Sequence, residues 1–182
     1  SLFNTTEKSC KTGVEILRER MYDMMRILVE ASLRGSNVLV DERELTLMLE
    51  NKGFQADEIF EAISWVHHLP GAREEYNEGI YESGRGKVIR ILHPEERLAF
   101  SPAAHGLIHK LYYDGAVDEI QREEIIQRCI DLASGEIGLE EVKTVALLLL
   151  LKERKDALSE NIMKILGIEI PPKTTEKNGK EN

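Results

Sequence analysis

Apolar residues recur at three- and four-residue intervals along most of this chain, which is the spacing of amphipathic helices. In the first half, the pattern predicts three helices, over residues 14–34, 42–51 and 56–68. Gly35, Gly53 and the pair Pro70-Gly71 follow the last apolar positions of these helices, where helix-ending residues belong. The chain therefore opens with a three-helix unit.

Individual residues support the predictions of the second and third helices. Asp41 stands at the N-cap of the second, and Glu44 follows three residues later, as in a capping box. The core candidates of this helix are Leu45, Leu47, Met48 and Leu49. The third helix places Phe60 and Trp65 at core spacings. Both helices are thus expected to bury one apolar face.

Two stretches depart from the helical spacing. Residues 37–40 (NVLV) are short and β-branched, which predicts a brief strand. Apolar and polar residues alternate through 80–82 and 87–92 around a turn at 83–86, which predicts a β-hairpin. Three helices with a strand after the first and a hairpin after the third follow the order of a winged-helix domain, placed here at residues 21–93.

The second half is helical throughout. Pro94 and Pro102 stand where helices begin, and further helices are predicted over residues 118–135, 138–153 and 156–166. Ile120 is among the residues expected to face inward. Residues 145–151 are apolar on every side, which predicts a central helix with neighbours all round. We place this all-helical, helix-turn-helix-like domain at residues 94–168, so the predicted fold is mainly α.

The net negative charge lies in the part of the chain that is predicted to fold. The 182 residues hold 24 Lys and Arg against 33 Asp and Glu, a net charge of −9. Residues 1–20 are expected to be a flexible extension with a charge of +1, and residues 169–182 a disordered tail with a charge of 0. The part between them therefore carries −10. Such a surface repels phosphate backbones and anionic lipids, which excludes generic coating of nucleic acid.

The chain is expected to be cytoplasmic, with no membrane partner. No apolar run approaches the roughly 20 residues that cross a bilayer. The first ten residues lack the basic-then-apolar order of a secretory signal. Cys10 and Cys129 belong to no CxxC pair and are expected to be reduced thiols.

Sequence motifs for catalysis are missing. The chain has no GxSxG, no HExxH and no Gly-rich phosphate loop. His105 and His109 lie four residues apart on one helix face, a spacing that can hold a metal, but two ligands make an incomplete site. Surface histidines are the favoured interpretation, and an enzyme that uses them is the alternative. We therefore predict no catalytic residue, no cofactor, no metal site and no enzymatic activity.

One basic cluster stands out in the folded part. Arg85, Lys87 and Arg90 fall within six residues on the predicted hairpin. In one interpretation these cations simply pair with Glu78 or Glu82 across the strands. In the other, they form a wing that binds nucleic acid or an acidic partner. The wing is the candidate binding site.

The third predicted helix argues against direct reading of DNA. In a winged helix, this element enters the major groove. Here it carries Asp57, Glu58 and Glu61 and no Lys or Arg. Each carboxylate brought against a phosphate costs on the order of a few kcal/mol before screening. Its acidic face is better suited to solvent or to a protein partner.

Five stretches together carry a family resemblance. They are MYDMMRILVEA, VDERELTLMLENKGF, DEIFEAISWVHHL, IRILHPEE and QREEIIQRCIDLASGEIGLEEVKTVALLLLL, in that order. With them the chain resembles the bacterial Smg family, whose domain has no known function. Members typically begin at the position of Met21, so residues 1–20 depart from the pattern. Their genes often neighbour genes for DNA-processing and topoisomerase-like proteins, so the resemblance implies a link to nucleic-acid metabolism by association alone.

The resemblance implies no activity, cofactor or catalytic residue. We expect a non-enzymatic adaptor that binds a protein partner, with any link to DNA or RNA metabolism made through that partner. The alternative is a winged-helix protein that binds nucleic acid directly through its basic wing. The oligomeric state and the relative orientation of the two domains stay open.

Overall fold

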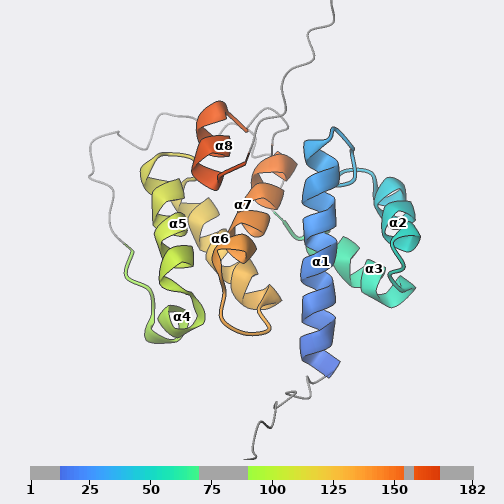
Figure 1. Cartoon of the computed structure of the whole chain (residues 1–182), viewed down its shortest axis with the longest axis horizontal. Coiled ribbons are helices and arrows are strands. Elements are labelled where there is room, and N and C mark those ends of the chain that lie inside the picture. The colour runs from blue at the N-terminus through green and yellow to red at the C-terminus, as the bar shows by residue number, and fades with distance from the viewer. Residues whose placement is uncertain (1–12, 70–89, 154–157, 169–182) are drawn as a thin grey trace, which may run out of the picture.

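The computed structural model describes residues 13–69, 90–153 and 158–168, and eight helices occur in these ranges (Figure 1). They are α1 (Gly13–Leu33), α2 (Glu42–Asn51), α3 (Ala56–His67), α4 (Pro94–Ala99), α5 (Pro102–Tyr113), α6 (Glu119–Leu132), α7 (Leu139–Glu153) and α8 (Glu160–Leu166). The mainly helical fold is therefore confirmed. The predicted extension is helical from Gly13 onward, and residues 1–12 and the predicted tail lie outside the described ranges.

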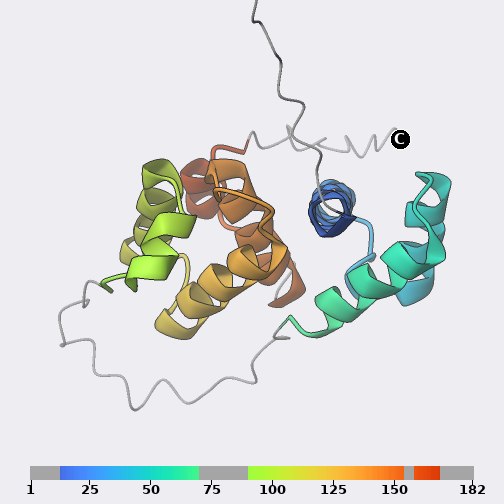
Figure 2. The same cartoon turned by 90° about the horizontal axis from the view of Figure 1, so that it is seen from below.

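The predicted central helix is confirmed. α7 contacts α1, α5 and α6, which surround it in both views (Figures 1 and 2). Its residues from Val145 to Leu151 are all buried. α1 packs against α7 on one side and against α3 on the other, so side chains from both halves of the chain join one hydrophobic core. The boundaries of the two domains stay a prediction.

Helix ends follow the local sequence signals. The backbone N–H groups of Arg43 and Glu44 donate to the Asp41 carboxylate over 3.0 and 3.1 Å, which caps α2. Gly53, at a φ of 85°, provides the left-handed residue in the short turn from α2 to α3. Ser101 caps α5 by accepting from the N–H of Ala104. These caps explain why most predicted helix bounds agree with the structure within about two residues.

The winged-helix prediction is not supported, because no sheet occurs among the residues that the structure describes. The strand predicted at 37–40 is wrong. These residues form a turn, closed by a bond of 2.8 Å from the Val40 N–H to the Asn37 carbonyl. Val38 and Leu39 are buried, so their apolar character fills the core without a strand partner. Most of the predicted hairpin lies outside the described ranges, and Ile91 and Leu92 form no strand.

Three residues expected in the core are exposed instead. The exposed fraction is 51% for Leu47, 68% for Phe60 and 59% for Ile120. In each helix, the buried stripe runs through residues three and four apart, and these side chains stand beside it. Leu47 and Phe60 stand next to other apolar residues, and adjacent positions cannot all lie on one helix face.

No helix in the described ranges is long and apolar enough to cross a membrane.

Candidate functional site

The structure places one of the three predicted wing residues. Arg85 and Lys87 lie outside the described ranges. Arg90 donates two hydrogen bonds to Glu96, of 2.8 and 3.0 Å, and its Nε lies 2.6 Å from a Glu123 carboxylate oxygen. Its charge therefore joins the segment before α4 to α6. This engagement favours a structural role for Arg90, while a binding role for the whole cluster stays a prediction.

The Arg90–Glu96 pair predicts a specific acid sensitivity. The pKa of Glu96 falls to about 2, chiefly because the Arg90 side chain donates hydrogen bonds to the carboxylate. The pKa of a glutamate in the unfolded chain is about 4.3, so the lower pKa in the folded state stabilises the fold at pH values above about 4.3. This stabilisation is lost as the pH falls from about 4.3 toward 2. Glu96→Gln should therefore lose less stability than the wild type between about pH 6 and pH 3.

Urea unfolding at several pH values measures this difference. The other carboxylates are present in both proteins, so their contributions cancel in the comparison. Parallel losses of stability in the wild type and in Glu96→Gln would show that Arg90 does not hold this carboxylate.

α3 is attached to the body of the molecule at its first turn. Glu58, 7% exposed, forms a two-pronged ion pair with Arg20 of α1, in which Arg20 Nη2 lies 2.7 Å from Glu58 Oε2. Glu58 also accepts a bond from the backbone N–H of Gln55. The hydrogen bond from Arg20 is the main reason that the pKa of Glu58 is lowered. Of the three carboxylates expected on the outer face, only Asp57 and Glu61 remain there.

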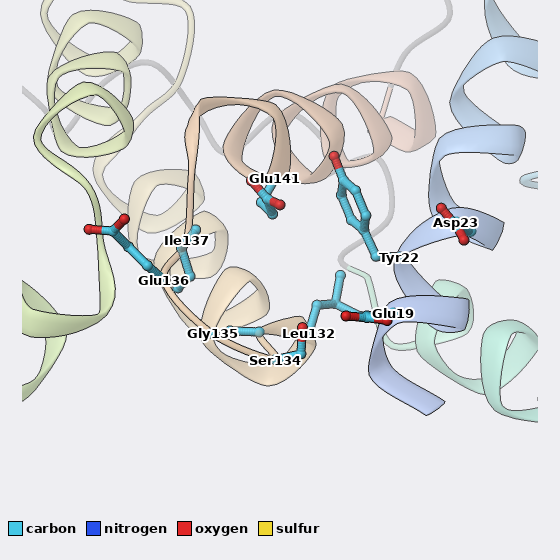
Figure 3. Close-up of a pocket in the computed structure, with 10 residues that line it drawn as sticks. Glu19, Tyr22, Asp23, Leu132, Ser134, Gly135, Glu136, Ile137 and Glu141 are labelled. Carbon is cyan, nitrogen blue, oxygen red and sulfur yellow. The ribbon is translucent and has the colours of Figure 1, made fainter. Parts of the chain in front are cut away.

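A cleft of about 320 Å³ lies between α1 and the loop that joins α6 to α7 (Figure 3). Its lining residues are Glu19, Tyr22, Asp23, Leu132, Ala133, Ser134, Gly135, Glu136, Ile137 and Glu141. Figure 3 shows Tyr22 rising from α1 toward α7, with Glu141 on α7 beside it, while Glu136 points away from α1. Four acidic residues therefore contribute to this concave surface, with the Glu136 carboxylate turned outward, and the lining residues include no Lys or Arg.

Hydrogen bonds hold the walls of this acidic cleft in place. The Arg18 guanidinium donates to the Ala133 carbonyl over 2.7 Å, and the Tyr22 hydroxyl lies 3.3 Å from the Thr144 hydroxyl. Burial raises the pKa of Tyr22, and the nearby Glu141 adds to the effect. The loop itself is fixed by Ile137, which is fully buried. The Ile137 N–H donates to the Ala99 carbonyl over 2.7 Å, and its carbonyl accepts from the Ser101 N–H.

This arrangement suits a cationic group. The lining combines four acidic residues with the apolar Leu132, Ala133 and Ile137. Within the described ranges, no three His, Cys, Asp or Glu side chains converge as metal ligands would.

Sequence reasoning missed this cleft. Glu19 and Asp23 lie four residues apart on α1, a spacing that places both on one face and could have been noticed. Glu141 lies in the first turn of α7, where a carboxylate offsets the helix dipole, so its position alone does not indicate a site. Because the two sets are more than a hundred residues apart in the chain, only the packing of α1 against α7 brings them together.

The histidines and the described cysteine show no reactive arrangement. His105 and His109 point toward each other, with 2.9 Å between their Nε2 atoms. The pKa of His105 is lowered by burial and by the proximity of His109. No third ligand joins them in the part of the chain described. Cys129 is buried, and burial raises the pKa of its thiol, so the thiolate form is disfavoured.

Comparison with known proteins places the chain in a family. Residues 21–171 match the family model described as "Protein of unknown function (DUF494)". A "Protein Smg homolog" from Pseudoalteromonas atlantica is 30% identical over 149 residues, which cover 79% of this chain and 94% of that protein. "Protein Smg" from Pectobacterium atrosepticum is 28% identical over 131 residues, which cover 71% and 83%.

No solved structure matches the chain. Within the cleft, Tyr22, Asp23, Glu136 and Glu141 lie inside the family match, whereas Glu19 precedes it. The family description names no reaction and no enzyme class. The predicted resemblance is thus confirmed, and the chain belongs to the bacterial Smg family, whose function is unknown.

Proposed function

We propose that this chain is a non-enzymatic cytoplasmic adaptor that accepts a basic segment of a protein partner in its acidic cleft. The observation that carries the proposal is the lining of the cleft, which contains four acidic residues and no Lys or Arg. A cleft lined by one sign of charge focuses its field on an approaching partner of the opposite sign. The charge of the whole chain, −9, steers the same partners toward it.

The walls of the cleft support binding without a large rearrangement. α1 and the α6–α7 loop are joined by the bond from Arg18 to Ala133, and α1 and α7 by the contact of Tyr22 with Thr144. A surface that is ordered before binding loses less conformational entropy when the partner docks. Proteins that process nucleic acids expose basic surfaces, and the gene neighbourhood that the family resemblance implies makes them the first partners to test.

Direct binding of nucleic acid finds less support. The outer face of α3 carries Asp57 and Glu61, and Arg90 is engaged by two carboxylates. A pull-down with the immobilised chain, followed by nuclease treatment, distinguishes the adaptor from a protein that binds nucleic acid directly. A protein partner retained by the immobilised chain under those conditions supports the adaptor.

Neutralising the cleft should weaken that complex. In Glu19→Gln/Asp23→Asn/Glu136→Gln, the affinity for the purified partner should fall about tenfold, and its dependence on salt should flatten, because fewer charges attract the basic segment. Isothermal titration at low and high salt measures both effects.

A matched variant separates this local effect from net charge. Glu30→Gln/Glu50→Gln/Glu95→Gln removes the same number of exposed carboxylates outside the cleft and should bind almost like the wild type. Equal losses in the two triple variants would show that the cleft is not the binding site. Tight binding of the pure chain to duplex DNA or to RNA would replace the adaptor by the alternative.

A further inference from the structure

α3 presents an aromatic side chain that the described part of the chain leaves exposed. Phe60 is 68% exposed, and Asp57 and Glu61 on the same outer face are exposed as well. Residues 57, 60 and 61 are neighbours on a helix surface, because they are one, three and four positions apart. α3 contains no Lys or Arg, and in the described ranges neither carboxylate forms an ion pair. We call these three residues the α3 face.

The α3 face is held rigidly from behind. Glu58, which follows Asp57 in the first turn and is buried, pairs with Arg20 of α1. At the other end, Arg128 of α6 donates to the His68 carbonyl over 2.7 Å and lies over the Trp65 ring. Because α3 is fixed at both ends, its backbone loses little further conformational entropy when a partner binds Phe60. Aromatic side chains on rigid elements are common anchors of protein interfaces.

We propose that the α3 face docks into a second protein, whose apolar pocket receives Phe60 and whose Lys or Arg side chains at the pocket rim face Asp57 and Glu61. Burial removes the exposed ring from water. The basic rim complements the two carboxylates, which would otherwise be brought against a surface without partners. Phe60 alone is the apolar anchor, because the apolar stripe of α3, formed by Ile59, Ala62 and Val66, is buried in the core of this chain.

Charge argues against two other occupants. In a symmetric dimer of this chain, a face that meets its own copy brings Asp57 and Glu61 against the same carboxylates. A nucleic-acid strand that stacked a base on Phe60 would bring its phosphates near these carboxylates. A protein with a basic rim avoids both repulsions.

The α3 face and the acidic cleft share no residue, because the cleft is lined by α1, the end of α6, the α6–α7 loop and α7. In Figure 1, most of α3 lies on the side of α1 away from α6 and α7. The proposal thus extends the proposed adaptor function to a second surface, so that the chain could hold two proteins at once. It does not depend on occupancy of the cleft.

Photo-crosslinking in the bacterial cell tests the proposal. One full-length variant carries p-benzoylphenylalanine in place of Phe60, and a second carries it in place of Ser134 at the cleft. We expect the variant at position 60 to give a discrete product with another protein, whose crosslinked peptide lies in an apolar pocket flanked by Lys or Arg. That protein is then purified and titrated with the full chain.

The titration compares three variants. Phe60→Ala should lower the affinity at least about tenfold, the loss expected for an anchor residue. Asp57→Asn/Glu61→Gln should lower it about threefold and flatten its salt dependence. Leu98→Ala, which truncates an apolar side chain on α4 that is 85% exposed, is the matched control and should bind like the wild type.

Each other outcome overturns the proposal. No product at position 60, a product with a second copy of this chain, a product with nucleic acid, or unchanged binding by Phe60→Ala would remove the α3 face as a docking site. A product at position 134 without one at position 60 keeps the proposed adaptor function and rejects the second surface. A product at position 60 without one at position 134 supports docking at the α3 face and contradicts binding in the cleft.

Discussion

Leu149→Ala should lower the free energy of unfolding by about 2–5 kcal/mol, the range for removing a fully buried leucine. Leu149 lies on α7 and has no exposed surface. Because α1, α5 and α6 all contact α7, the surrounding helices cannot close fully around the missing atoms. For a chain of this size, the melting temperature should fall by about 5–15 °C. Urea unfolding followed by circular dichroism and by Trp65 fluorescence measures the loss.

Leu98→Ala serves as the control for this prediction. It removes the same atoms from a side chain that is 85% exposed on α4, so the free energy of unfolding should change by less than about 0.5 kcal/mol. Similar losses in the two variants would show that α7 is not enclosed by its neighbours. Coincident curves from both probes are needed before either value is interpreted as a two-state free energy.

Local signals in the sequence predict the helices because the physics that ends a helix is local. Asp41 before α2 and Ser101-Pro102 before α5 act through their own neighbours in the chain. The continuous apolar run of α7 also predicts its burial, since no face of such a helix tolerates water. The strand predicted at 37–40 is wrong because contacts with distant residues decide the conformation there. β-branched residues are also suited to a buried turn, and only tertiary contacts decide between the two.

The candidate surfaces depend on tertiary contacts. The sequence shows the carboxylates of α3, but Glu58 pairs with Arg20 and is buried, whereas Phe60 is exposed, contrary to the prediction. Arg90 was predicted either to pair with Glu78 or Glu82 across a hairpin or to belong to a binding wing, and the structure shows it engaged by Glu96 and Glu123 instead. Such pairings join residues from different elements, so composition and periodicity could not reveal them.

Lys152→Met should destabilise the protein by about 1–3 kcal/mol, because it removes the donor for the last carbonyl groups of α3. From α7, the Lys152 ammonium donates to the carbonyls of Val66, His67 and Leu69, the latter two over 3.2 and 2.7 Å. Burial lowers the pKa of Lys152, and the nearby charge of Arg128 adds to this effect. Methionine keeps the apolar stem of the side chain and removes only the donor.

The loss should be concentrated at α3, where amide hydrogen exchange should accelerate more than in α5 or α6. Lys143→Met is the matched control on the same helix. Lys143 pairs with Glu140 over 2.8 Å at positions three apart, and such surface pairs contribute only about 0.3–0.5 kcal/mol. Equal effects of the two substitutions, or uniform exchange across the helices, would mean that Lys152 does not fix α3. If the expected result holds, Lys152→Met should also weaken any partner that binds the α3 face, because Phe60 would no longer be held in one position.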